Sequence, residues 1–259
     1  MGVQSYLEVH PVFSLDEFRS ELGESQTHYN LLMRATRRGL VDRVVRGVYV
    51  SRAGQYASVE PDPFVVATKL APDTTLVYHS ALEAHGLAHS PWRRVQFTTT
   101  RRVRRFAYRG FSYERYDLPS PLKPEGDVRF TTLLRRPGGV VRVSSRERTL
   151  VDAVNRSDLC GGPEEVFRSL ASLPFVDSSN VIEYLRALGT STAVARVGLV
   201  LEQRARDWYV AEDDLVVMRD MLGPGPYYFT GKSETGRWVA TWKLYLPSDA
   251  ADYEIWLNG

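Results

Sequence analysis

The sequence contains very little cysteine and no long apolar run. Cys160 is the single cysteine among 259 residues. One cysteine excludes a disulfide framework and also a zinc site built from several thiolates. The sequence lacks the run of about 18 apolar residues that a membrane-spanning helix needs, and its first residues lack the basic and apolar regions of a signal peptide. We therefore expect a cytoplasmic protein without membrane contact.

Lysine is scarce and the net charge is close to zero. Only four of the 33 basic residues are lysine, and the formal net charge is +2. The charge is nevertheless unevenly distributed: residues 25–52 carry six arginines and one acid, and residues 93–109 carry seven arginines and no acid. Residues 207–259 carry nine acids and four bases. Such asymmetry is expected when one part of a chain meets a polyanion and another part does not.

The motifs of nucleotide-binding proteins and serine hydrolases are missing. The sequence contains neither the P-loop pattern nor a G-x-G-x-x-G stretch after a strand. Ser80 and Ser145 lack the G-x-S-x-G context of a hydrolase nucleophile. The sequence therefore favours a protein without a cofactor, without catalytic residues and without enzymatic activity.

Three histidines raise the question of a metal site. His79, His85 and His89 lie within eleven residues, but the first two are six positions apart and Gly86 would end a helix before the third. Helical metal ligands are usually four positions apart. We interpret these histidines as structural and expect no bound metal.

A metal-dependent nuclease is the alternative from another functional class. Such a site needs an aspartate followed by an acid and a lysine about two residues apart, which hold Mg²⁺ and orient a water molecule. The nearest approaches are Lys123 with Glu125 and Lys232 with Glu234. Both have lysine before the acid, the reverse of the usual order, so a nuclease stays the second hypothesis.

The first fifty residues predict two helices followed by a hairpin. Residues 12–22 have apolar residues at helical spacing, with Ser14 as the N-cap, Glu17 as its capping-box partner and Gly23 at the end. Residues 26–38 predict a second helix, and two β-branched strands flank Arg46 and Gly47. This order is typical of a winged helix-turn-helix, which we assign to residues 1–58.

Eight residues of this segment are the candidate DNA contacts. A basic helix face can also be an ordinary solvated face, but here the helix and the hairpin are both basic on the side expected to face outward. We expect the arginines to neutralise phosphates, and the other residues, near the helix N-terminus, to read base edges. The candidates are Thr27, His28, Asn30, Arg34, Arg37, Arg38, Arg43 and Arg46.

Residues 59–259 predict a larger mixed α/β domain, so that the whole chain is α+β. Strand-like stretches come first and a helical block follows. We expect strands at 95–100, 106–117, 127–133 and 139–145, a strand that enters a helix within 75–87, and helices at 64–72, 146–155, 163–173, 178–188 and 191–206. The stretch 227–246 predicts a hairpin with its turn at 233–236.

A second basic patch lies at the start of this larger domain. Its arginines alternate with aromatic residues, a combination that can bind nucleic acid by phosphate contact and stacking. A strand pair with solvated arginines and buried aromatics, and a docking site for an acidic protein, are the alternatives. The patch comprises Arg93, Arg94, Arg101, Arg102, Arg104 and Arg105.

Six stretches occur in a fixed order along the chain. They are HPVFSLDEF, RRGLVDRVVRGVYV, LVYHSALEAHGL, RVSSRERTLVDAV, DLCGGPEEVFRSL and TSTAVARVGLVLE. In these stretches the chain resembles the AbiEi family, the antitoxins of type IV toxin–antitoxin (abortive infection) systems. The resemblance runs from about residue 10 to 205, while residues 207–259 depart from the family pattern.

The resemblance implies a bacterial protein with two roles. Its N-terminal domain would bind inverted repeats in its own promoter as a repressor, and its C-terminal domain would counteract a nucleotidyltransferase-like toxin without a stable complex. A monomer in solution, with two copies on DNA, fits this picture. His85, Arg148, Thr149 and Asp152 match the family pattern, and we interpret them as fold-forming because residues 148 and 152 can pair across one helical turn. A regulator of the same fold without a toxin is a further alternative.

Overall fold

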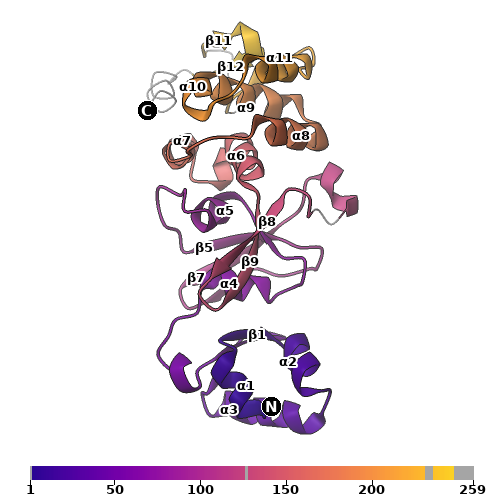
Figure 1. The fold of residues 1–259 in the computed structure, drawn as a ribbon, viewed down its shortest axis with the longest axis vertical. Coiled ribbons are helices and arrows are strands. Elements are labelled where there is room, and N and C mark those ends of the chain that lie inside the picture. The colour runs from indigo at the N-terminus through magenta and orange to yellow at the C-terminus, as the bar shows by residue number, and fades with distance from the viewer. Residues whose placement is uncertain (1, 126–127, 231–235, 248–259) are drawn as a thin grey trace. The chain divides into compact units, whose positions relative to one another are not determined.

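The computed structural model describes residues 2–125, 128–230 and 236–247 and shows a mixed α+β fold (Figure 1). The chain divides into two compact units. The first unit comprises Met1–Leu76, Arg93–Asp117 and Leu133–Val143, and the second comprises Val77–Trp92, Leu118–Thr132 and Ser144–Gly259. The chain thus passes between the units several times, and the boundary expected near residue 58 stays a prediction.

The N-terminal part of the first unit contains the two expected helices and the hairpin. It also contains a short helix and a short strand that the sequence did not predict, and this strand pairs antiparallel with the second strand of the hairpin. The elements are α1 (Val3–Val9), β1 (Val12–Ser14), α2 (Leu15–Leu22), α3 (Gln26–Arg37), β2 (Val41–Val45) and β3 (Val48–Ser51).

Local sequence signals determine where α2 begins and where α3 ends. At the start of α2 the backbone N–H of Glu17 donates to Ser14 Oγ at 3.1 Å, and the backbone N–H of Ser14 donates to the Glu17 carboxylate at 2.8 Å. This is the predicted capping box. At the end of α3, Gly39 has φ +73°, and the N–H of Leu40 bonds the carbonyl of Ala35 at 3.0 Å. A left-handed glycine after the last turn is the usual way to end a helix.

Aromatic side chains form the core of this N-terminal part. Tyr6, Phe13, Phe18 and Tyr49 are buried, and the ring of Tyr6 meets those of Phe13 and Phe18 edge-on at 5.2 Å. Leu32 of α3 packs into the same cluster. Burial of large rings contributes much of the stability of so small a core, and it holds α3 against α1 and α2.

A six-stranded sheet in the order β6-β7-β5-β4-β9-β8 forms most of the rest of the first unit. The expected strand at 106–117 is two strands, because Arg109 and Gly110 both have positive φ and make the tight turn of a hairpin. The strand expected at 127–133 begins later and runs further. The elements are α4 (Pro63–Thr68), β4 (Thr75–Leu76), β5 (Arg94–Thr98), β6 (Phe106–Tyr108), β7 (Phe111–Tyr116), β8 (Thr131–Arg136) and β9 (Gly139–Ser144).

The second unit is mainly helical. Its buried Arg148 lies 3.2 Å from Asp152, as the spacing predicted, and the hydroxyl of Tyr184 donates to Asp152 at 2.8 Å. The last predicted helix is split in two, and a further helix follows it. The helices are α5 (Tyr78–Ala84), α6 (Arg146–Asn155), α7 (Pro163–Leu170), α8 (Ser178–Leu188), α9 (Ser191–Gln203), α10 (Ala205–Trp208) and α11 (Glu212–Asp220).

The hairpin predicted at 227–246 is wrong. Strand β10 (Tyr227–Tyr228) runs parallel to β12 (Leu244–Tyr245), and it is β11 (Trp238–Val239) that pairs antiparallel with β12. A short 3₁₀ helix reverses the chain between β11 and β12 and carries the buried Trp242. This ring packs directly on Gly198 of α9, where a Cβ would lie 2.1 Å away. Most of the turn expected at 233–236 lies outside the described residues.

Helix length and hydropathy bear on membrane insertion. No helix in the part of the chain that the structure describes is both long enough and apolar enough to cross a membrane.

Candidate nucleic-acid interface

One face of α3 carries most of the candidate DNA contacts. Thr27, Asn30, Arg34, Arg37 and Arg38 are all exposed. The first four are three or four positions apart, and Arg38, the residue at which the helix ends, is four positions after Arg34, so all five lie on one side of the helix. The helix begins at Gln26, so the two uncharged candidates lie in its first turns and the arginines lie toward its C-terminal end.

His28 does not belong to this exposed face. The sequence placed it outside, but it is half-buried, and its Nδ1 is buried without a hydrogen-bond partner in the part of the chain that the structure describes. The reason is the helical period: His28 is four positions before Leu32 and seven before Ala35, and both of these are buried. Its role as a base reader stays a prediction.

The hairpin brings its two arginines to a basic groove. Arg43 and Arg46 are exposed, and Gly47, with φ +85°, makes the turn beside them. They line a cavity of about 420 Å³ in the first unit, to which three other cationic residues and one acid, Asp16, contribute. Sequence reasoning missed this convergence, which tertiary folding produces. The additional cations are Arg19 of α2, Lys69 after α4, and Arg101 of the second basic patch.

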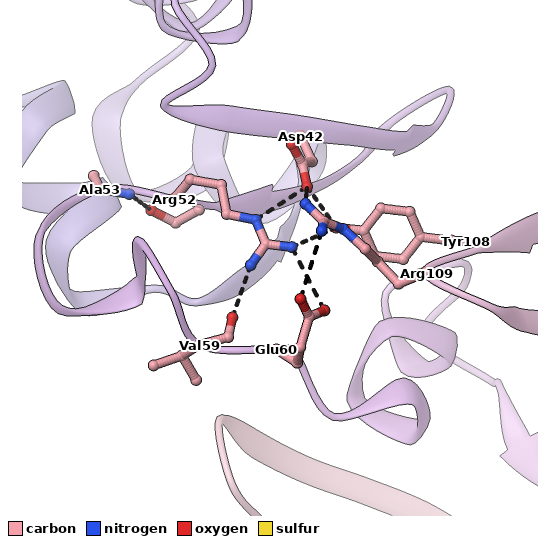
Figure 2. Close-up of polar contacts among 8 residues, drawn as sticks. Asp42, Arg52, Ala53, Val59, Glu60, Tyr108 and Arg109 are labelled. Carbon is pink, nitrogen blue, oxygen red and sulfur yellow. Dashed lines mark hydrogen bonds and ion pairs between the residues drawn. The ribbon is translucent and has the colours of Figure 1, made fainter.

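Asp42 is the one acidic residue between positions 25 and 52, and a network of donors surrounds it (Figure 2). Its Oδ2 accepts hydrogen bonds from Arg52 Nε at 3.0 Å, from the Tyr108 hydroxyl at 2.9 Å and from Arg109 Nη2 at 2.9 Å. Arg52 is only 8% exposed and also donates to the carbonyl of Val59 at 2.7 Å. The network ties the hairpin to the turn between β6 and β7.

These contacts determine the charge state of Asp42. Partial burial alone would raise the pKa of its carboxyl, but the hydrogen bonds from Arg109, Tyr108 and Arg52 outweigh burial, so the pKa lies below its ordinary value. The carboxylate is therefore charged and already compensated by two guanidinium groups.

The arginines of α3 and the hairpin have no such compensation. Among the described residues, no ion pair reaches any of them, since Asp42 is occupied by Arg52 and Arg109. Their positive charge is available to a ligand. These residues are Arg34, Arg37, Arg38, Arg43 and Arg46.

The second basic patch is divided. Arg94 and Arg105 both approach Oε1 of Glu114, at 3.5 and 3.0 Å, and the guanidinium of Arg93 lies 5.8 Å from the centre of the Phe111 ring. In this part of the patch two arginines pair with an acid and one packs beside an aromatic ring. Arg101, Arg102 and Arg104 lie exposed in the loop between β5 and β6, where no ion pair reaches them in the described part of the chain.

The three histidines of the second unit have separate surroundings. His79 is buried, with Nδ1 3.2 Å from Glu83 and Nε2 3.3 Å from Glu165, and its ring stacks on Trp92 at 3.8 Å. His85 Nε2 donates to the carbonyl of Ser144 at 2.7 Å, and burial lowers the pKa of His85. The backbone of His89 bonds Ser169 Oγ at 2.9 Å.

The three histidines and the two lysine–acid pairs raised the question of a metal site. Within residues 2–125, 128–230 and 236–247, no group of three or more His, Cys, Asp or Glu side chains is arranged to hold a metal ion. Lys232 and Glu234 lie outside the described residues.

Comparison with known proteins finds a solved structure whose fold is similar to that of this chain. No family model matches the sequence, and no curated protein matches it. The chain is similar to the crystal structure of the RV2827C protein from Mycobacterium tuberculosis, with a TM-score of 0.61 and 14% sequence identity over 98% of this chain and 92% of that chain. At such low identity the similarity concerns the fold alone.

Proposed function

We propose that this protein is a sequence-specific DNA-binding repressor of its own promoter and the antitoxin of a type IV toxin–antitoxin system. In this proposal α2, α3 and the β2–β3 hairpin form a winged helix-turn-helix. The observation that carries it is the set of five uncompensated arginines on α3 and the hairpin, next to an acidic residue that already has two cationic partners. Uncompensated positive charge on a helix face and a neighbouring hairpin favours a polyanionic ligand.

DNA recognition would follow the usual division of labour in this fold. The second helix of the motif enters the major groove, and the wing reaches the adjacent backbone. Thr27 and Asn30, exposed in the first turns of α3, would face base edges. The arginines of α3 and the hairpin would neutralise phosphates, which gives affinity and register but no sequence information.

Partners and assembly rest on the resemblance to the AbiEi family. Two copies would bind an inverted repeat, one on each half-site, without a stable dimer in solution. The antitoxin role predicts a neighbouring gene for a nucleotidyltransferase-like toxin. If the neighbouring reading frames contain no such gene, the function reduces to that of a regulator with the same fold and no toxin.

A footprint on the DNA upstream of the gene tests the central proposal. We expect protection of an inverted repeat, and binding at least about 10³-fold tighter than to random duplex at the same salt concentration. Equal affinity for both duplexes would contradict sequence-specific repression. The same labelled duplex incubated with Mg²⁺ or Mn²⁺ should stay intact, and strand cleavage would favour the nuclease instead.

A further inference from the structure

An apolar groove lies beside the proposed recognition helix. It lies between α1, α3 and the 3₁₀ helix Gly54–Tyr56, all in the first unit, and encloses about 490 Å³. This volume is within the range of about 300–1,000 Å³ typical of small-molecule sites. We call it the α1–α3 groove.

Small side chains create the space in the α1–α3 groove. Ala35 and Ala53 are buried at its floor, and Gly54 has φ +54°. At its rim, Leu31 and Leu40 are 39% and 43% exposed, which is high for leucine. An apolar cavity whose leucines face water gains free energy when an apolar chain covers them.

The charged residues at the edge of the α1–α3 groove indicate which head group a ligand with an apolar chain should carry. Arg34 of α3 and Arg38, the residue directly after this helix, both line it. Glu8, also in the lining, accepts a hydrogen bond from Gln4 Nε2 at 3.2 Å. Two guanidinium groups beside an apolar cavity form a good site for a carboxylate, which accepts charge-assisted, bidentate hydrogen bonds from arginine.

We infer that the α1–α3 groove binds an amphiphilic monocarboxylate. Its carboxylate pairs with Arg34 and Arg38, and its apolar chain covers Leu31 and Leu40. A further consequence rests on the proposed DNA-binding function. The bound anion occupies two of the arginines that face phosphate, so the ligand weakens the complex with DNA and acts as an effector of the repressor.

Calorimetric titration of the full chain with decanoate, below its micelle concentration, tests the binding step. We expect saturable binding at one site with a negative heat-capacity change, the mark of apolar burial. Decyltrimethylammonium has the same chain length and the opposite head-group charge, so it should bind at least about tenfold more weakly. Absence of decanoate binding, or equal binding of both amphiphiles, would overturn the inference.

Two matched variants locate the ligand. Leu31→Glu places a carboxylate at the rim of the groove and should reduce decanoate affinity at least about tenfold. Val140→Glu makes the same change at a residue of β9 that is 50% exposed and does not line the groove, and it should leave the affinity unchanged. Both side chains are exposed, and circular dichroism checks that both variants fold. Equal affinity in the two variants would contradict the site.

Arg38→Gln, which removes the positive charge and leaves a shorter polar side chain, should also weaken decanoate binding without weakening the binding of decyltrimethylammonium. Sedimentation of wild type and Leu31→Glu tests a different occupant of the groove, namely a second copy of the chain. If the wild type self-associates and the variant does not, the groove is an interface between copies of the chain and the ligand proposal fails.

Measuring DNA binding in the presence of decanoate distinguishes a failure of this inference from a failure of the proposed function. Saturating decanoate should lower the slope of log affinity for DNA against log salt by about two units in wild type, and it should have no effect on Leu31→Glu. If decanoate binds as expected and the protein binds no DNA, the groove proposal stands and the repressor proposal fails. If decanoate binds and DNA affinity does not change, the effector role is wrong.

Discussion

The two arginine-rich segments look equivalent in the sequence and differ in the structure. Asp42 and Glu114 are each approached by two guanidinium groups, so each acid offsets positive charge locally. The partners of Asp42 come from outside the exposed face of α3 and the hairpin, whereas both partners of Glu114 belong to the second basic patch itself. A count of arginines is therefore not a count of available charges.

The largest expected effect is on stability, at Arg52. Arg52→Ala removes a nearly buried partner of Asp42 and leaves that carboxylate with less compensation. Breaking a buried pair costs about 3–5 kcal/mol, and since Asp42 is partly exposed and keeps Arg109, we expect a loss of about 2–3 kcal/mol. Urea unfolding measures this change in the free energy of unfolding.

Arg46→Ala is the matched control for Arg52→Ala. It removes an exposed arginine without an ion pair in the described part of the chain, so the free energy of unfolding should change by no more than about 0.5 kcal/mol. Similar losses in both variants would show that the network around Asp42 contributes no particular stability.

The next effect is on sequence preference, at Asn30. Asn30→Ala should reduce affinity for the operator by roughly 1–3 kcal/mol if the side chain makes a bidentate base contact, and it should change affinity for random duplex much less. Competition binding with both duplexes measures the ratio. Equal losses on both would mean that Asn30 contacts the backbone or no DNA at all.

Arg46 and Arg94 give the sharpest contrast between the two basic segments. Arg46→Ala should weaken binding to every duplex and lower the salt slope by about one unit, because one phosphate contact is lost. Arg94→Ala removes a residue that already pairs with Glu114, so the slope should stay the same. A salt titration measures both slopes. A larger change in the Arg94 variant would reverse the assignment of the two segments.

Local features of this fold were predictable and non-local ones were not. The capping box of Ser14 and Glu17 and the turn at Gly47 depend on residues within a few positions, and the structure confirms both. By contrast, two other features join segments that are distant in the sequence. Arg101 contributes to the basic groove at the β2–β3 hairpin, and β10 pairs parallel with β12. No pattern within a single stretch of sequence specifies such contacts.

His28 shows a limit of a different kind. Helical periodicity was available from the sequence, and the positions of Leu32 and Ala35 would have placed His28 on their side of α3. Polarity alone suggested an exposed side chain, and the helical period decided otherwise. A polar residue is therefore better assigned by its spacing from apolar neighbours than by its own chemistry.

The smallest expected effect is the pH dependence contributed by Asp42. Its pKa is lowered in the folded protein, so the folded state binds the proton less readily than the unfolded state, whose pKa is near the ordinary 3.8. The stabilisation is therefore complete above the unfolded pKa and is lost as the pH falls through the folded pKa. We expect the difference in unfolding free energy between wild type and Asp42→Asn to be constant near neutrality and to shrink below about pH 4. Urea unfolding at a series of pH values measures this difference, and a difference that grows on acidification would mean that Asp42 is held protonated in the fold.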